Sequence, residues 1–322
     1  MPSMTYDALL VVSFGGPEGP DDVMPFLRNV TAGRTVPPER LAAVAEHYAT
    51  FGGVSPINGH TRRLVAALEH HIELPIYWGN RNWHPFLADT LATMAGHGVH
   101  RALAFVTSGF SSYPSCHQYL DDIAAARAKV GPTAPQVDKL RVFFNHPRFI
   151  EAQADRLNPV LDPDARVLFS AHSIPLAMAA TCDYEAQLHE AAALVAEQCG
   201  VSDWRVVYQS RSGPPTQPWL GPDVSDAIAD SAPHNVVVVP IGFVCDHMEV
   251  VFDLDVVARK RAEAAGVAFA RAGTVGDHPA FVAMIGELLH ERTDRAPRRA
   301  VGRFGPRDDI CGNDCCPQPQ KP

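Results

Sequence analysis

The sequence predicts an α/β protein with two similar lobes, each a parallel sheet with helices against it, and a cleft at the carboxyl ends of their strands. Short runs of apolar, mostly β-branched residues recur between segments with helical periodicity. Most of these runs are unbroken rather than alternating, as in strands buried on both faces of a parallel sheet. A series of strand and turn motifs from the first half of the chain also returns, in the same order, in the second half.

The expected strands come from the apolar runs, and the expected helices from apolar stripes between them. An apolar stripe at helical spacing runs over 23–30 behind Asp21 and Asp22, whose charges favour a helix N-terminus. A second stripe covers 87–94 and stops before Gly96. The proline-containing stretch 128–137 is expected to be a surface loop. The eight expected strands are 8–14, 75–78, 102–107, 140–144, 165–170, 204–209, 235–241 and 267–271.

An internal repeat suggests how the chain is divided. Three pairs of strand-and-turn segments match in the same order, which favours duplication over coincidence: 12–17 with 169–175, 76–81 with 207–211, and 108–110 with 241–243. Two similar lobes would bind ligands at the carboxyl ends of their strands. We expect an N-terminal lobe over 1–145, a C-terminal lobe over 146–295 and a cysteine-bearing tail over 296–322.

Charge and hydropathy restrict the partners and the compartment. Asp and Glu number 36 against 27 Lys and Arg, for a net charge of −9, which argues against a nucleic-acid partner. The longest apolar run, 236–245, is about half of the roughly 20 residues that span a bilayer. The first residues lack the basic start of a signal peptide. We therefore expect a cytoplasmic protein with no transmembrane segment.

Two residues near strand ends could carry chemistry. His172 follows a buried strand, although with 15 histidines in the chain a structural, hydrogen-bonded histidine is the more common case. Glu249 follows the run 236–245, and a helix there would align it with Asp246 and Asp253 on one face. These carboxylates could form a solvated face or could line a cleft for work on cations or protons, and the pattern leaves both open.

Two further segments allow more than one interpretation. The loop 214–222 is rich in proline and carries one tryptophan, so it could wall a pocket for a flat ligand, but a purely structural loop is favoured. The tail holds Cys311, Cys315 and Cys316, which suggests a metal centre completed by one cysteine from the body. The candidates for that fourth ligand are Cys116, Cys182, Cys199 and Cys245, of which packing suffices to explain the last two. Spacing alone does not separate zinc from an iron–sulfur cluster.

The chain resembles the ferrochelatase family along almost its whole length. The motifs that carry the resemblance are Ser13–Pro17, Tyr48 with Phe51–Pro56, Ser170–Pro175, Tyr208–Arg211 with Pro218–Pro222, and Pro240–Phe243 with Asp246–Glu249. The resemblance implies the chelatase fold, which is an α/β fold of two Rossmann-like lobes with parallel four-stranded sheets around a central cleft. It also implies an enzyme, a lyase of haem biosynthesis, that inserts ferrous iron into a porphyrin with loss of two pyrrole protons.

The resemblance also implies roles for individual residues. His172 and Glu249 match the catalytic pair, which can hold the metal or accept the pyrrole protons, with the division of labour left open. Ser55 and Tyr119 match positions that contact the porphyrin. The tail is similar to that of relatives with a [2Fe–2S] cluster, and the implied ligand set is Cys116, Cys311, Cys315 and Cys316.

The most specific expectations concern which porphyrin is the substrate and which partners the protein has. The sequence is similar to actinobacterial enzymes that act on coproporphyrin III to give coproheme, and the alternative substrate is protoporphyrin IX. A chelatase for another metal or tetrapyrrole is the alternative within the fold, and a non-catalytic, two-lobed haem- or tetrapyrrole-binding protein is the alternative from another class. We expect a monomer that binds porphyrin and ferrous iron and makes transient contact with neighbouring enzymes of the haem pathway.

Overall fold

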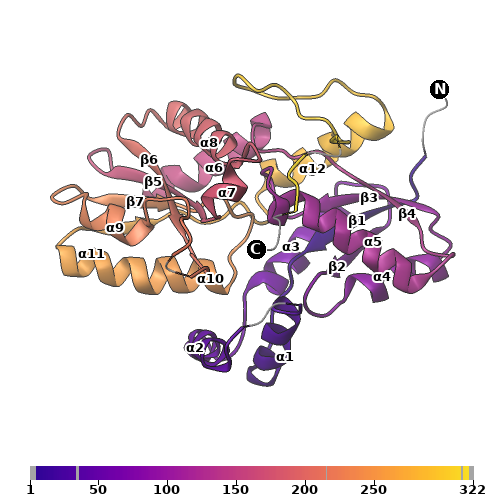
Figure 1. Ribbon diagram of the computed structural model, residues 1–322. Helices are drawn as coiled ribbons and strands as arrows, with labels where there is room; N and C mark the ends of the chain where they lie inside the picture. The colour runs from indigo at the N-terminus through magenta and orange to yellow at the C-terminus, as the bar shows by residue number, and fades with distance from the viewer. Residues whose placement is uncertain (1–4, 34–35, 215, 313–314, 319–322) are drawn as a thin grey trace. The chain divides into compact units, whose positions relative to one another are not determined.

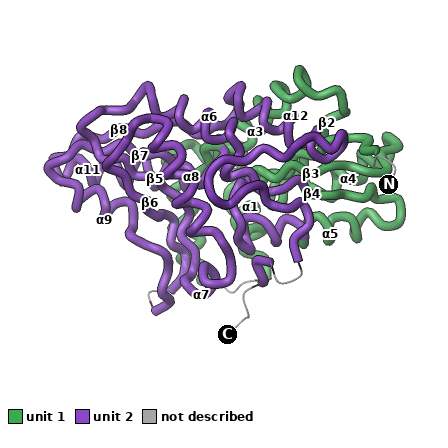
Figure 2. Tube along the Cα trace, turned by 90° about the horizontal axis from the view of Figure 1, so that it is seen from above, with its two compact units in different colours: residues 1–107, 121–139, 245–248 green, residues 108–120, 140–244, 249–322 purple. Residues whose placement is uncertain are grey.

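The chain forms two compact units, which we describe separately. The computed structural model describes residues 5–33, 36–214, 216–312 and 315–318. Unit 1 contains residues 1–107, 121–139 and 245–248, and unit 2 contains 108–120, 140–244 and 249–322 (Figure 2). The lobe boundaries expected from the sequence stay a proposal.

Unit 1 is built on a four-stranded parallel sheet in the order β2-β1-β3-β4. Every residue of β1 is buried, as expected for an unbroken apolar strand in the middle of a covered sheet. The strands are β1 (Ala8–Ser13), β2 (Ile76–Asn80), β3 (Arg101–Val106) and β4 (Gln136–Lys139).

The helices of unit 1 include the two that the apolar stripes predict. α1 begins at Pro20 with Asp21 and Asp22 in its first turn, and it buries Val23, Phe26 and Leu27. α4 buries three leucine and methionine side chains of the second stripe. The stretch 128–137 is a shorter loop than predicted, because a helix runs to Val130 and a strand begins at Gln136. The helices are α1 (Pro20–Val30), α2 (Pro38–Ala49), α3 (Ile57–Glu69), α4 (Leu87–Gly96) and α5 (Gln118–Val130), whose first three residues are assigned to unit 2.

Unit 2 repeats the sheet of unit 1. Its parallel strands run in the order β6-β5-β7-β8, which matches β2-β1-β3-β4 strand for strand. The equivalence supports the repeat inferred from the sequence, because the paired motifs follow equivalent strands. The strands are β5 (Arg166–His172), β6 (Trp204–Gln209), β7 (Val236–Val239) and β8 (Phe269–Arg271).

Helices cover both faces of this second sheet (Figure 1). On one face, Leu168 of β5 and Val207 of β6 pack with α9, η3 and α11 in one apolar cluster. α6 packs against α8 and α12. The helical segments are η1 (Tyr113–His117), α6 (Pro147–Leu157), η2 (Asn158–Val160), α7 (Leu176–Ala179), α8 (Tyr184–Cys199), α9 (Val224–Ala229), α10 (Met248–Val250), η3 (Val251–Ala258), α11 (Arg259–Ala265) and α12 (Pro279–Thr293), with η1 and η3 π-helical and η2 a 3₁₀ turn. The first residue of α10 is assigned to unit 1.

One predicted strand is wrong. The run 140–144 is buried but makes no strand, and the strand at this edge is the more polar Gln136–Lys139, which pairs with Arg101–Ala104. Phe143 and Phe144 instead pack their rings against other aromatic side chains of unit 2. Burial in that aromatic cluster accounts for the apolar run, and apolarity alone does not distinguish such a segment from a buried strand.

The tail after α12 is anchored to unit 2 by buried charge. Arg141 is 2% exposed, and its guanidinium donates to Glu291 at 2.7 and 2.9 Å and to the Arg299 carbonyl at 2.8 Å. The Asp309 carboxylate accepts from the Arg141 amide at 3.1 Å and from Arg298 at 2.6 Å. No helix within the described ranges is long and apolar enough to cross a membrane.

Candidate active site and cysteine pocket

His172 is the last residue of β5, and its backbone and ring are both held. The Tyr184 hydroxyl donates to the His172 carbonyl at 3.0 Å. The ring atom Nδ1 lies 2.6 Å from the Ser173 carbonyl oxygen. Because a carbonyl only accepts, Nδ1 is the donor of this contact, and in the tautomer that this requires the lone pair of the ring lies at Nε2. That atom is free to bind a metal ion or to accept a proton.

Glu249 faces this nitrogen. Its Oε2 lies 3.7 Å from His172 Nε2, and the side chains are 56% and 34% exposed, so both are accessible to a ligand. Metal–nitrogen and metal–oxygen bonds of about 2.1 Å could bridge up to about 4.2 Å, so both atoms can reach one divalent ion. The structure thus brings together the two residues that the sequence predicts as a pair, 77 positions apart in the chain.

Asp253 continues the line of carboxylates on the π-helical segment η3. Burial raises the pKa of Asp253 to about 6, the hydrogen bond from Ser210 opposes the rise, the charge of Glu249 adds to it, and that of His172 opposes it. Asp246 comes before α10 begins at Met248, so the predicted helical face carries two of the three acidic residues. The next position at this spacing is Val257, an exposed apolar side chain, where the acidic row ends.

Gln209 and Ser210, at the end of β6, adjoin this site; both lie in a motif that carries the family resemblance, but the sequence analysis gave neither a role. Gln209 is the register partner of His172, and its Nε2 lies 3.5 Å from Asp253 Oδ2. Ser210 Oγ donates to the same oxygen at 2.5 Å. The available signal was their position directly at the end of the strand next to β5.

The loop 214–222 supports the backbone that carries His172. Trp219 forms an antiparallel bridge with Pro175, and Ser173 Oγ donates to the Leu220 carbonyl at 2.8 Å. Within the described part of this loop, which excludes residue 215, these contacts are of the structural kind, and its role as the wall of a ligand pocket stays a prediction. Gly242 supports β5 from its other side, because a methyl group there would lie 2.6 Å from the Cβ of Ala171.

The two predicted porphyrin contacts are placed in different units. Ser55 of unit 1 is 3% exposed, its amide donates to the Pro17 carbonyl at 2.8 Å, and Gly16 lies directly against its side chain. Tyr119 of unit 2 is the second residue of α5 and is 5% exposed. Their contact with a porphyrin stays a prediction.

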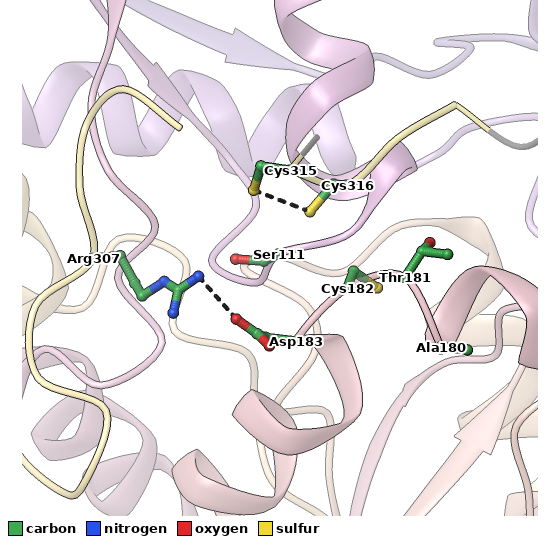
Figure 3. A pocket seen from close by; sticks show the side chains of 8 residues that line it. All are labelled: Ser111, Ala180, Thr181, Cys182, Asp183, Arg307, Cys315 and Cys316. Atoms are coloured by element: carbon green, nitrogen blue, oxygen red, sulfur yellow. Dashed lines mark hydrogen bonds and ion pairs between the residues drawn. The ribbon is translucent and has the colours of Figure 1, made fainter. Parts of the chain in front are cut away.

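A second feature of unit 2 is a pocket of about 320 Å³ lined in part by cysteines (Figure 3). Cys182, Cys315 and Cys316 line it, and an ion pair of 2.8 Å joins Arg307 to Asp183 at its side. Cys182 is not in the ligand set that the family resemblance implies. The structure therefore places a further thiol beside two of the predicted ligands.

Two of the four predicted cysteine ligands, Cys315 and Cys316, have the spacing of ligands to one metal ion. Cys315 Sγ and Cys316 Sγ are 3.8 Å apart, which is about the separation of two sulfurs on one tetrahedral metal with bonds near 2.3 Å. Burial, with Cys315, Cys116 and Cys182 nearby, raises the pKa of the Cys316 thiol. Cys116 is buried in η1, whose His117 Nδ1 lies 3.3 Å from the Cys315 carbonyl oxygen, so the tail lies against that helix. Cys311 is exposed.

The four predicted cysteines do not form a closed site as placed. Among the described residues, no three His, Cys, Asp or Glu side chains gather closely enough to hold a metal ion. Residues 313 and 314, between Cys311 and Cys315, lie outside the described ranges. The donor chemistry and the Cys315–Cys316 spacing fit a thiolate-bound metal, while Cys311 would have to approach the other three.

Comparison with known sequences identifies relatives over nearly the whole chain. A family model described as Ferrochelatase matches residues 6–293. The ferrochelatase of Rhodopirellula baltica is 54% identical over 327 residues, covering 97% of this chain and 93% of that protein. The coproporphyrin III ferrochelatases of Frankia alni and Mycobacterium tuberculosis are 50% and 51% identical, covering 99% and 93% of this chain and 89% and 90% of those proteins.

Solved structures match the fold at much lower identity. SirB from Bacillus subtilis with Fe3+ superposes with a TM-score of 0.58 at 11% identity, covering 90% of this chain and 96% of that one. The multi-domain protein DR2241 from Deinococcus radiodurans, described as similar to chelatases, gives 0.52 at 16% identity, covering 88% of this chain and 55% of its own. At these identities the matches establish the chelatase fold, with its two parallel four-stranded sheets.

Proposed function

We propose that this chain, which belongs to the ferrochelatase family and inserts ferrous iron into a porphyrin, acts on coproporphyrin III and forms coproheme. The choice of porphyrin is supported by relatives named coproporphyrin III ferrochelatases that are 50% and 51% identical over most of the chain. The runner-up substrate is protoporphyrin IX. We also propose that the chain is a cytoplasmic monomer.

His172 and Glu249 are the proposed catalytic pair, and the 3.7 Å separation of His172 Nε2 from Glu249 Oε2 is the observation that carries this proposal. Insertion replaces two pyrrole N–H bonds by bonds from the nitrogens to Fe²⁺, so two protons must leave for each iron. A neutral imidazole with a free Nε2 and a carboxylate opposite it supply both a ligand for the incoming ion and an acceptor for a proton. Which of the two takes each task stays open.

We propose that Asp253, on η3 directly after the helix that carries Glu249, is the next proton acceptor. Its pKa of about 6 leaves the carboxylate mostly ionised at pH 7. Because that pKa is close to pH 7, the group can both take up and release a proton. A non-catalytic porphyrin-binding protein would need neither an accepting carboxylate nor a second one behind it. The acidic line therefore favours turnover over simple binding.

The test of the porphyrin is an anaerobic assay of iron insertion with coproporphyrin III and protoporphyrin IX side by side, followed by loss of the free-base porphyrin fluorescence. We expect coproporphyrin III to give the higher kcat/KM. A preference for protoporphyrin IX would refute the proposed substrate.

The test of the pair is His172→Ala, which should abolish insertion while coproporphyrin III still quenches the protein's tryptophan fluorescence. His189→Ala, on α8 and outside the proposed site, is the matched control. Undiminished turnover in His172→Ala would contradict the assigned role.

For the tail we propose a [2Fe–2S] cluster held by Cys116, Cys311, Cys315 and Cys316. The support is the 3.8 Å spacing of two of the thiols and the contact of the tail with the helix that carries Cys116. When bound, such a cluster supplies four iron–thiolate bonds that cross-link the tail to the body of unit 2. The cysteines themselves need only lose their thiol protons to bind it.

The cluster is tested by the visible absorption, iron and acid-labile sulfide of protein purified without oxygen. We expect about two irons and two sulfides per chain, and their loss in Cys316→Ser but not in Cys199→Ser, whose thiol lies on α8. A colourless protein that contains zinc would contradict the cluster.

A further inference from the structure

Ser210 has an unusual backbone at a chemically important place. It directly follows the last residue of β6, and its φ is +59°, in the left-handed region that non-glycine residues rarely occupy. Within the described ranges only Arg295 and Cys316 share this feature among non-glycine residues. Such a conformation persists when surrounding contacts hold it, and it is concentrated at functional sites.

The contact that accompanies this conformation is a hydrogen bond to Asp253. Ser210 Oγ donates to Asp253 Oδ2 at 2.5 Å, whereas the Gln209 amide nitrogen is 3.5 Å from the same oxygen, at the limit of a hydrogen bond. The serine hydroxyl therefore makes the shorter of the two hydrogen bonds to this carboxylate oxygen. This hydrogen bond engages Oδ2 of Asp253, so Oδ1 is the oxygen that Ser210 does not contact.

The surroundings of Asp253 explain why a fixed donor matters. Glu249, one turn earlier, repels its charge, and His172 from β5 favours that charge when protonated. α9, which also packs on η3, contributes Val224, Ala227 and Ile228 to the shared apolar cluster. A carboxylate between an apolar cluster and a second carboxylate is destabilised as an anion, and a hydrogen bond to the charged form offsets this.

We propose that Ser210 is a positioning residue of iron insertion: its left-handed backbone aims its hydroxyl at Asp253 and holds that carboxylate oriented and ionised, as the proton acceptor behind Glu249. The inference rests on the proposed roles of His172, Glu249 and Asp253. A proton released from a pyrrole nitrogen passes to the catalytic pair and then to the Asp253 oxygen that Ser210 leaves unengaged, and it leaves to solvent from there. No bond other than N–H and O–H is made or broken on this route.

Two substitutions separate the hydroxyl from the backbone. Ser210→Gly removes the hydroxyl and tolerates the left-handed backbone, whereas Ser210→Ala removes the hydroxyl and keeps the unfavourable Cβ. We expect both to lower kcat for coproporphyrin III about tenfold with little change in KM, and to move the acid limb of the kcat–pH profile to higher pH. Ser210→Asn, which tolerates this backbone and offers an amide donor, should recover part of the loss, and Ser202→Ala, at an exposed serine before β6, is the matched control.

A double-mutant cycle with Asp253→Asn completes the test. If the hydroxyl acts through Asp253, Ser210→Ala lowers kcat much less in the Asp253→Asn background than in the wild-type background. Equal fold losses in the two backgrounds, or wild-type kcat and pH profile in both Ser210→Gly and Ser210→Ala, would overturn the proposal. Failure of the proposed function itself looks different, because the wild-type chain would then not turn over coproporphyrin III or would remain active as His172→Ala.

Discussion

Replacing Asp253 by asparagine should stabilise the protein at neutral pH, and the gain should disappear in acid. In the folded state the pKa of Asp253 is raised to about 6 from a reference of 3.8, chiefly by burial. A raised pKa means that the folded state binds the proton more tightly than the unfolded state does. The associated stability is fully present below pH 3.8 and is lost as the pH rises through 6. Asparagine removes the ionisation and can still accept the Ser210 hydrogen bond.

The size of the effect follows from the two pKa values. A difference of about two pKa units corresponds to about 3 kcal/mol at pH 7.5, where Asp253 is ionised in both states. At pH 4.5 the folded protein holds the proton and the unfolded chain is only partly ionised, so the remaining difference is about 1 kcal/mol. The advantage of Asp253→Asn over the wild type should therefore shrink by about 2 kcal/mol between the two pH values.

Urea unfolding of both proteins at pH 7.5 and pH 4.5, followed by circular dichroism, measures this difference. Asp226→Asn, at an exposed position of α9, controls for the loss of one negative charge from unit 2. A gain that is the same at both pH values, or a variant less stable than the wild type at pH 7.5, would refute the reasoning about burial.

Two further predictions concern the tail and the support of His172. Arg141→Ala should reduce the free energy of unfolding by about 3–5 kcal/mol, because it leaves the buried Glu291 carboxylate without its bidentate partner; unchanged urea midpoints would contradict this. Gly242→Ala should destabilise by about 1–3 kcal/mol and lower kcat, because the new methyl group would lie 2.6 Å from the Cβ of Ala171, next to His172. The same substitution at Gly286, where no atom lies within 4 Å, should be neutral or stabilising, and equal losses at both glycines would argue against the steric explanation.

The parallel sheets were predictable because central strands of covered sheets are apolar on both faces. The central strands β1, β3, β5 and β7 lie where apolar runs predict them. The edge strand β4 was missed because its own sequence is mostly polar, while the apolar run after it is buried by aromatic packing instead. Sequence thus predicts burial more directly than it predicts hydrogen-bond pairing.

The sequence by itself determined the family and the repeated α/β architecture, and it pointed to His172 and Glu249 as the candidate catalytic pair. These conclusions depend on residue types in a particular order along the chain. Only the tertiary structure decided that Nε2 of His172 faces Glu249, that Ser210 donates to Asp253, and that Cys182 joins the cysteine pocket while Cys311 is exposed. Ser210 and Asp253 are 43 residues apart. Their contact arises because the end of β6 and the helical segment η3 pack against each other, and no local pattern in the sequence encodes that approach.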